Sequence, residues 1–425
     1  MITLNRAEAP VYHQPENLTL KEAESHYLNN GIPFYFINAT RQDLIKFDVV
    51  FYAGKYHEST PGQSHLCAKM LLEGTKNLSS SELAEKIAQY GAQLTIESSY
   101  DRLTFSVATM NKYLKPVLGI VKDIILHSAF PDKEYQQQQK IFQEQLKVNY
   151  QKTSYLSNLH FKRLFFGEGH PYAEAITPDI ISQLSLKDLS SFYEDFIKNK
   201  SFEIISCGKI TTDIINVFEF ELGRIDITSG ATTQKELIPS PQQGIHHFVK
   251  TDAKQTSLRI GQKAIGKHHP DYYALRILNE VLGGYFGSRL MQVIREQKGY
   301  SYGIQSSLVS FDHADFMLIA GDIISEHKED ALNEIYHQID LLKTTLVSEE
   351  ELILVKNNLL GSLSNSLSSP FDLMEKFKQL HFSGLSYAWY KDYVHKIKSI
   401  SCEELLETAQ KYYHQDNMLT VTSGG

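Results

Sequence analysis

The chain has 425 residues, of which 42% are hydrophobic, so it can bury the cores of two ordinary domains. Its formal net charge is −8 and it has no dense run of Lys and Arg, which argues against nucleic acid or an acidic membrane surface as the main partner. No stretch reaches the roughly 18 apolar residues that spanning a bilayer requires.

The first residues contain no apolar core of signal-peptide length, and the three cysteines, Cys67, Cys207 and Cys402, lie far apart without a Cys-x-x-Cys pair. Free thiols in a reducing compartment are therefore expected. We expect a cytoplasmic protein, with the periplasm as the alternative if a leader has been removed.

The first half of the chain should combine short strands with amphipathic helices. The apolar run at 47–52 predicts a strand, and the alternation over 91–107 predicts a strand pair that bends near Ser98 and Ser99. Apolar residues at helical spacing predict a helix over 111–127, and a second helix is expected over 134–152. This mixture indicates the α+β class.

Residues 62–75 have the frame of a His-x-x-Glu-His zinc helix, but two of the three chemical residues are missing. His65 stands in the first place, Ala68 where the catalytic Glu belongs and Lys69 where the second ligand belongs. A catalytic zinc needs about three protein ligands, a water and a carboxylate that takes the water's proton. We therefore expect this chain to bind no metal of its own.

The second half of the chain repeats the first. Residues 181–189 resemble 397–405, and the same offset of 216 carries 203–208 onto 419–424. Each copy is expected to form a Ser-capped helix followed by a strand that ends in Gly. We predict a first domain over 1–224, a small, polar linker over 225–243 and a homologous second domain over 244–425.

With this repeat, this helix and this length, the chain resembles the pitrilysin/insulinase family of zinc metallopeptidases. The similarity is to the two-domain bacterial branch that is related to mitochondrial processing peptidase. The family pattern around the metal helix is matched by Gly62, His65, Met70, Gly74 and Thr75, and the strand pattern after it is matched by Gly91, Leu94 and Asp101. Thr95 and Ile96 replace the Asn-Ala pair that helps to seat the substrate backbone in the family. The resemblance implies two tandem homologous domains, each an antiparallel sheet flanked by helices in a two-layer roll.

The resemblance also places the third metal position. The family's third zinc ligand is a Glu about 75 residues past the second His, and Glu144 stands 75 residues after Lys69. Our hypothesis is that the Lys69 ammonium takes about the place of the zinc and forms a salt bridge with Glu144. The alternative is that both side chains point into solvent.

The second half carries another family motif, over 290–302. In the family an Arg and a Tyr seven residues apart face the zinc across the substrate cleft, and Arg295 and Tyr302 have that spacing, with Gly299 at the turn between them. A guanidinium can hold peptide carbonyls, and a phenol can donate to a developing oxyanion. Where the family pairs unlike chains, one keeps the zinc motif and the other keeps the Arg/Tyr pair.

The sequence therefore has the profile of the non-metal subunit. We expect it to be inactive alone and active only with a zinc-bearing homologous subunit, whose zinc is the cofactor, and to act on an unfolded or short peptide. The alternative is a structural or peptide-binding homologue without a role in proteolysis. A third reading, a self-sufficient peptidase, predicts stoichiometric zinc in the purified chain.

Overall fold

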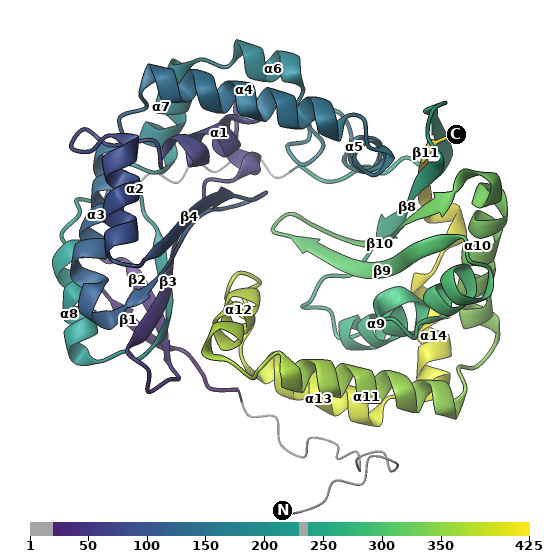
Figure 1. Cartoon of the computed structure of the whole chain (residues 1–425). Helices are drawn as coiled ribbons and strands as arrows, with labels where there is room; N and C mark the ends of the chain where they lie inside the picture. The colour runs from purple at the N-terminus through teal and green to yellow at the C-terminus, as the bar shows by residue number, and fades with distance from the viewer. Residues whose placement is uncertain (1–19, 229–236) are drawn as a thin grey trace, which may run out of the picture.

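The computed structural model describes residues 20–228 and 237–425, which form two α+β halves on opposite sides of the molecule (Figure 1). The first sheet has the order β1-β2-β6-β3-β5-β4, and the second has the order β7-β11-β8-β10-β9.

The strands of the first half are β1 (Glu24–Tyr27), β2 (Pro33–Asn38), β3 (Leu44–Phe51), β4 (Gln93–Ser98), β5 (Leu103–Met110) and β6 (Glu203–Gly208). Its helices are α1 (Gln63–Met70), α2 (Ser80–Gln89), α3 (Leu114–His127), α4 (Asp132–Asn149), α5 (Thr153–Phe166), α6 (Pro178–Gln183), α7 (Leu186–Phe196) and α8 (Thr212–Glu221). The strands of the second half are β7 (Gly244–Val249), β8 (Gln255–Lys263), β9 (Ser301–Phe311), β10 (Ala314–Ile324) and β11 (Leu419–Gly424). Its helices are α9 (Tyr272–Asn279), the π-helical η3 (Glu280–Gly284) and η4 (Met291–Gln297), α10 (Lys328–Thr344), α11 (Glu349–Asn365), α12 (Pro370–His381), α13 (Ala388–Ser399) and α14 (Cys402–Tyr412).

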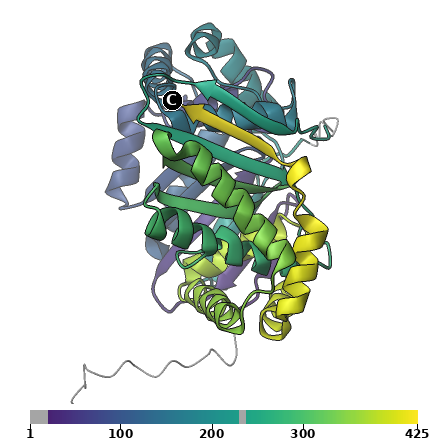
Figure 2. The same ribbon diagram turned by 90° about the vertical axis from the view of Figure 1, so that its right-hand side faces the viewer.

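Without the edge strand β1, the first sheet has the same topology as the second, and neither sheet is wholly antiparallel. The α+β class is confirmed, but the predicted antiparallel sheets are mixed. Strand β6 runs parallel to β2 and antiparallel to β3, and β11 runs parallel to β7 and antiparallel to β8. Each of these strands returns after a long helical segment and enters the middle of its sheet, which fixes one parallel and one antiparallel neighbour. Figure 2 shows β11 in yellow within the second sheet, with α10 across its outer face.

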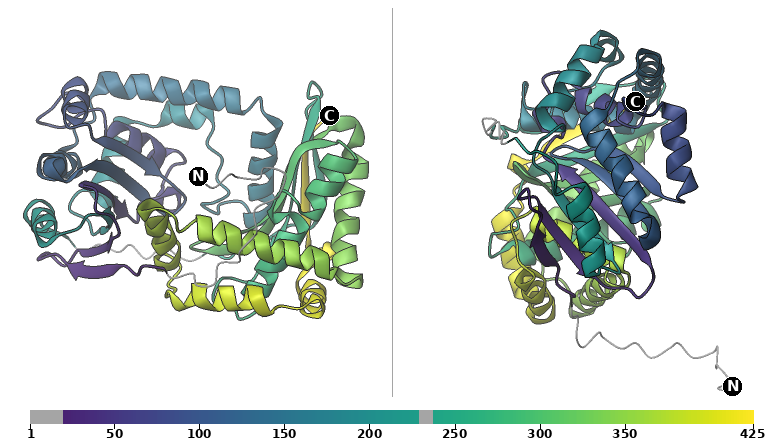
Figure 3. Two further views of the ribbon diagram at one scale, coloured as in Figure 1. Left: turned by 60° about the horizontal axis from the view of Figure 1, so that its bottom comes forward. Right: turned by 90° about the vertical axis from the view of Figure 1, so that its left-hand side faces the viewer.

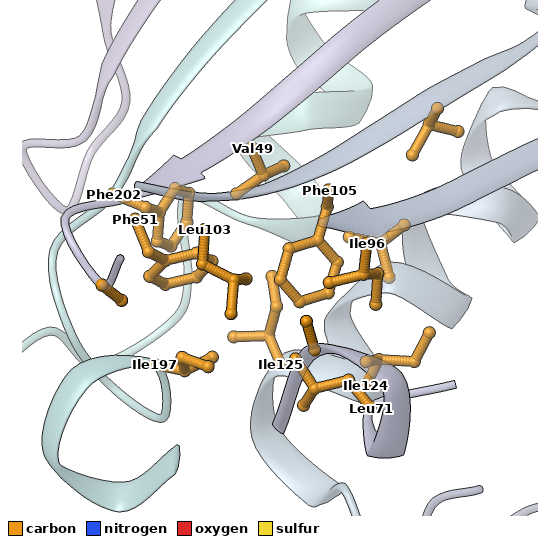
Figure 4. Close-up of a cluster of buried hydrophobic side chains, with 14 of the residues drawn as sticks. Val49, Phe51, Leu71, Ile96, Leu103, Phe105, Ile124, Ile125, Ile197 and Phe202 are labelled. Carbon is orange, nitrogen blue, oxygen red and sulfur yellow. The ribbon is translucent and has the colours of Figure 1, made fainter. Parts of the chain in front are cut away.

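The core of the first half lies between its sheet and helices α1, α3 and α7. Every second residue of β5 is buried, as expected for a strand with one covered face. Figure 4 shows side chains of β3, β4 and β5, among them Val49 and Phe105, meeting Ile124 and Ile125 of α3. The predicted strand pair and the predicted helix over 111–127 are both present.

One helix of each half packs against the sheet of the other half. Helix α5 lies on β8 and β11, where Phe161 and Phe165 join a cluster with Phe316 and Val421. Helix α12 lies on β2 and β6, where Met374 and Phe377 pack on a second cluster, which contains Ile37, Ile205 and Cys207. Figure 3 shows α12 standing between the first sheet and helices α11 and α13. This exchange of helices joins the halves through apolar contacts.

Polar contacts add to this interface. Arg102, in the turn after β4, makes a bidentate ion pair with Asp312, in the turn after β9, with N–O distances of 3.0 and 2.6 Å. The predicted linker over 225–243 includes residues 229–236, which lie outside the described part of the chain, so its bounds stay a prediction. Among the described residues, every helix is too short or too polar to cross a bilayer.

Candidate functional site

Helix α1, which carries the degenerate zinc motif, is held in place at its first turn. The carboxylate of Glu58 accepts hydrogen bonds from the backbone N–H groups of Gly62 at 3.0 Å and Ser64 at 2.8 Å. Gly62 has φ +94°, and a Cβ there would approach Ile181 to 2.6 Å, so only glycine fits. Burial raises the pKa of Glu58 above its usual value. The start of the motif is therefore fixed even though its chemical residues have changed.

The three motif positions of α1 have different surroundings. Ala68 is only 1% exposed and belongs to the core of the first half, whereas Lys69 is exposed. His65 is half-buried, and its ring centroid lies 4.2 Å from that of Phe142 on α4. Burial, and then the charge of Lys69, lowers the pKa of His65 to about 4. The imidazole is therefore neutral at ordinary pH.

The proposed salt bridge between Lys69 and Glu144 is wrong. The Glu144 carboxylate is exposed and lies 2.7 Å from the Lys147 ammonium, and no ion pair among the described residues joins it to Lys69. Lys147 lies three residues after Glu144 on α4, a spacing at which two side chains of one helix are neighbours. An exposed carboxylate is hydrated and needs no buried cation, so the alternative, with both side chains in solvent, describes the structure.

Glu144 faces an open groove of about 820 Å³ that follows one side of α4. The groove is lined by Gln137, Lys140, Ile141, Glu144, Gln145, Val148, Asn149 and Lys152. Ile141 and Val148 are 41% and 59% exposed. This side of α4 is therefore an accessible surface with apolar as well as charged groups.

The strand that follows the motif helix is at an edge. β4 pairs only with β5, so its other side is free among the described strands. Thr95 is exposed and Ile96 is buried, as the alternation along the strand requires. Asp101, in the next turn, is buried and accepts hydrogen bonds from the Tyr172 hydroxyl and from the Asp312 backbone N–H. Asp101, which matches the acidic residue of the family's strand pattern, therefore has a structural role between the two halves.

The Arg/Tyr motif lies where η4 passes into β9. Gly299, with φ +68°, makes the turn between the two elements, as its place in the sequence predicts. Tyr302 is 91% exposed, and β9 is an edge strand. The Arg295 guanidinium lies 4.6 Å from the centroid of the Phe286 ring and 3.5 Å from the Glu296 carboxylate. Both side chains can therefore reach an external ligand.

Next to this motif the structure shows a pocket that sequence reasoning missed. It has a volume of about 560 Å³ and is lined by Phe286 and Gly303 together with Arg259 of β8 and Asp322 of β10. Arg259 donates to the Leu258 carbonyl at 2.7 Å. Arg259 and Asp322 belong to no motif, and only the sheet brings them together, so no sequence signal could have found them.

Two family models match this chain: Insulinase (Peptidase family M16) over residues 36–166, and Peptidase M16 inactive domain over residues 183–359. The chain belongs to the M16 family. It is 22% identical over 399 residues to the uncharacterized zinc protease YmxG of Bacillus subtilis, with 93% of this chain and 96% of that protein covered. It is 23% identical over 425 residues to the zinc protease PqqE of Helicobacter pylori, with 95% and 93% covered.

Solved structures share the fold of this M16 chain. A peptidase M16 inactive domain from Pseudomonas fluorescens superposes with a TM-score of 0.85 at 22% identity, covering 95% of this chain and 98% of that one. A protease from Helicobacter pylori has a TM-score of 0.85 at 18% identity, covering 95% and 100%. The two-domain M16 architecture implied by the resemblance is thus confirmed at the level of the fold.

The residues at the motif positions of this M16 chain do not fit a zinc ion. An alanine replaces the carboxylate that would take a proton from the metal-bound water, and an ammonium replaces one of the two imidazole ligands. Among the described residues, no group of three or more His, Cys, Asp or Glu side chains is arranged to hold a metal ion. In the second half, Tyr302 is exposed and Arg295 is partly exposed.

Proposed function

We propose that this chain is the non-metal subunit of a heterodimeric zinc metallopeptidase and acts on a peptide bound at the partner's zinc. The observation that carries the proposal is the exposure of Tyr302 at the start of the edge strand β9. Arg295 lies seven residues earlier, on η4. With 91% of it exposed, the Tyr302 side chain belongs to none of the hydrophobic clusters of the described residues. The motif lies in the half matched by the M16 inactive-domain model, and the first half has Lys69 in place of the second zinc ligand and Ala68 in place of the catalytic Glu.

The two side chains have complementary roles in this proposal. The Arg295 guanidinium, stacked on Phe286, donates hydrogen bonds to a peptide carbonyl and positions the substrate. The Tyr302 phenol donates a hydrogen bond to the carbonyl oxygen as negative charge develops on it. The partner supplies the zinc and the water that it activates.

Co-expression with a homologue that has an intact His-x-x-Glu-His motif tests the proposal. Cleavage of an unstructured peptide should require both chains, and Tyr302→Phe should lower kcat by about 10²–10³, the usual effect of losing one oxyanion donor. Arg295→Ala should raise KM and lower kcat/KM. Matched controls are Tyr27→Phe, an exposed tyrosine on β1, and Arg41→Ala, an exposed arginine of the first half.

Full activity in both motif variants would contradict the roles of Arg295 and Tyr302. A homologue that is fully active without this chain would instead favour the alternative, a structural or peptide-binding protein. Stoichiometric zinc in this chain alone would contradict the proposal as a whole.

A further inference from the structure

A second pocket lies in the second half of the chain, between α9, α11, α12 and α13, whose arrangement is visible in Figure 1. Its volume is about 380 Å³, within the roughly 300–1,000 Å³ typical of small-molecule sites. Three cations, Lys267, Arg276 and Lys376, line it, together with a single carboxylate, that of Glu280. Glu280 already accepts a hydrogen bond from the Asn358 amide at 2.9 Å, and burial raises its pKa.

The three cations make no close ion pair within the part of the chain that the structure describes. None of them takes part in an ion pair within 4.0 Å among the described residues. Lys267 donates to the Ser383 hydroxyl at 2.9 Å, and Arg276 donates to the Tyr393 hydroxyl at 2.9 Å. Carboxylates act on these charges only from beyond ion-pair distance: Glu280 on Arg276, Asp315 on Lys267 and Asp372 on Lys376.

These charges also repel one another. Burial, and then the charge of Arg276, lowers the pKa of Lys376. Burial lowers the pKa of Lys267, and Arg276 adds to this lowering less than Asp315 opposes it. Asp372 and Asp315 act in the opposite direction on the two lysines, but they do not outweigh these effects. Arg276 is accessible to solvent and lines the pocket. Convergent cations without a close carboxylate are typical of a binding site rather than of a structural cluster.

The walls of the pocket are aromatic and fixed. Trp389 Nε1 donates to the Lys267 carbonyl at 3.2 Å, and the Tyr390 hydroxyl donates to Gln379 at 3.2 Å. The Lys376 ammonium lies 5.9 Å from the centroid of the Tyr390 ring. Polar groups at one place and flat apolar faces around them suit a ligand with a charged head and a carbon skeleton.

We propose that this pocket binds a small organic oxyanion with two or more negative charges, of the phosphate-ester or polycarboxylate class. Phosphate and carboxylate oxygens are the natural partners of convergent Lys and Arg donors. The ligand would supply the negative charge that the protein lacks there. This proposal does not depend on the peptidase function.

Isothermal titration calorimetry of the full chain with pyrophosphate and with citrate, at matched ionic strength, tests the proposal. We expect one site per chain. Lys376→Gln and Lys267→Gln should each weaken binding about tenfold, which corresponds to about 1.4 kcal/mol. The matched control is Lys391→Gln, because Lys391 is an exposed residue of α13 that does not line the pocket.

Thermal denaturation without ligand provides a second measurement. Lys376→Gln should unfold at the same temperature as the wild type or at a higher one, because it removes an unpaired charge that Arg276 repels. Binding of either probe that is lost in the two pocket variants and kept in Lys391→Gln supports the proposal, and the probe that binds identifies the oxyanion. The absence of saturable binding for both probes up to millimolar concentrations, or an equal loss in Lys391→Gln, would overturn it.

Discussion

The ion pair between Lys378 and Asp48 should be a main determinant of how the two halves hold together. Lys378 lies on α12 of the second half, and Asp48 lies on β3 of the first half with 0% of its side chain exposed. The distance from Nζ to Oδ2 is 2.7 Å. Burial alone would lower the pKa of Lys378, but the charges of Asp48 and Glu375 outweigh it and raise that pKa.

Replacing Lys378 with Met would leave the Asp48 carboxylate buried without its cation. Breaking one partner of a buried pair costs about 3–5 kcal/mol. The entropy of unfolding is about 2.1 cal/mol/K per residue, so a chain of 425 residues that unfolds in one transition has about 0.9 kcal/mol/K. The melting temperature should therefore fall by roughly 3–6 °C.

Differential scanning calorimetry measures this shift. The control is Lys198→Met, which breaks the more exposed pair with Glu194, four residues earlier near the end of α7, and should have a much smaller effect. The double variant Asp48→Leu with Lys378→Met should regain most of the loss, because no charge then remains buried. A shift equal to that of Lys198→Met, or no recovery in the double variant, would refute this reasoning.

Three further predictions concern Glu203 and the degenerate motif. The Glu203 carboxylate lies 2.5 Å from His381 Nε2. Burial would raise the pKa of Glu203, but the contact with His381 outweighs it and lowers that pKa below 4.5. Its stabilising contribution is therefore present above pH 4.5 and lost as the pH falls further, and Glu203→Gln should remove that part of the pH dependence in urea denaturation. Lys69→Met should raise the pKa of His65 from about 4, although burial keeps it below 6.5, and an NMR titration of the imidazole would detect the change. Lys69→His adds a second imidazole on the same face of α1 as His65, so zinc analysis should find tighter zinc binding than in Lys69→Gln, which keeps a single imidazole there.

Much of the fold could be predicted because local patterns determine it. The alternation over 91–107 and the apolar stripe over 111–127 correspond to β4, β5 and α3, and the offset between 203–208 and 419–424 corresponds to β6 and β11. Which neighbours those two strands take is a non-local property, so the mixed sheets were missed. The exchange of α5 and α12 was missed because an amphipathic helix does not encode which sheet covers its apolar face.

The candidate site could be predicted where residues lie close together in sequence. His65, Ala68 and Lys69 share one helix, and Arg295 and Tyr302 flank one turn. The pairing of Lys69 with Glu144 could not be predicted, because it depends on side-chain directions on two different helices. The basic pocket gave no signal either, since its three cations come from separate segments without a motif.

Helix α12 connects that pocket to the interface between the halves. Lys376 lines the pocket, whereas Lys378, two positions later and therefore on another side of the helix, pairs with Asp48 of the first half. A ligand that binds only the folded chain stabilises it by about 2.7 kcal/mol at a concentration one hundred times its dissociation constant. Pyrophosphate or citrate, whichever binds, should therefore raise the melting temperature of the wild type and offset part of the loss in Lys378→Met. If calorimetry shows that Lys378→Met binds the probe as tightly as the wild type does, the pocket does not depend on a docked α12, and this coupling is refuted.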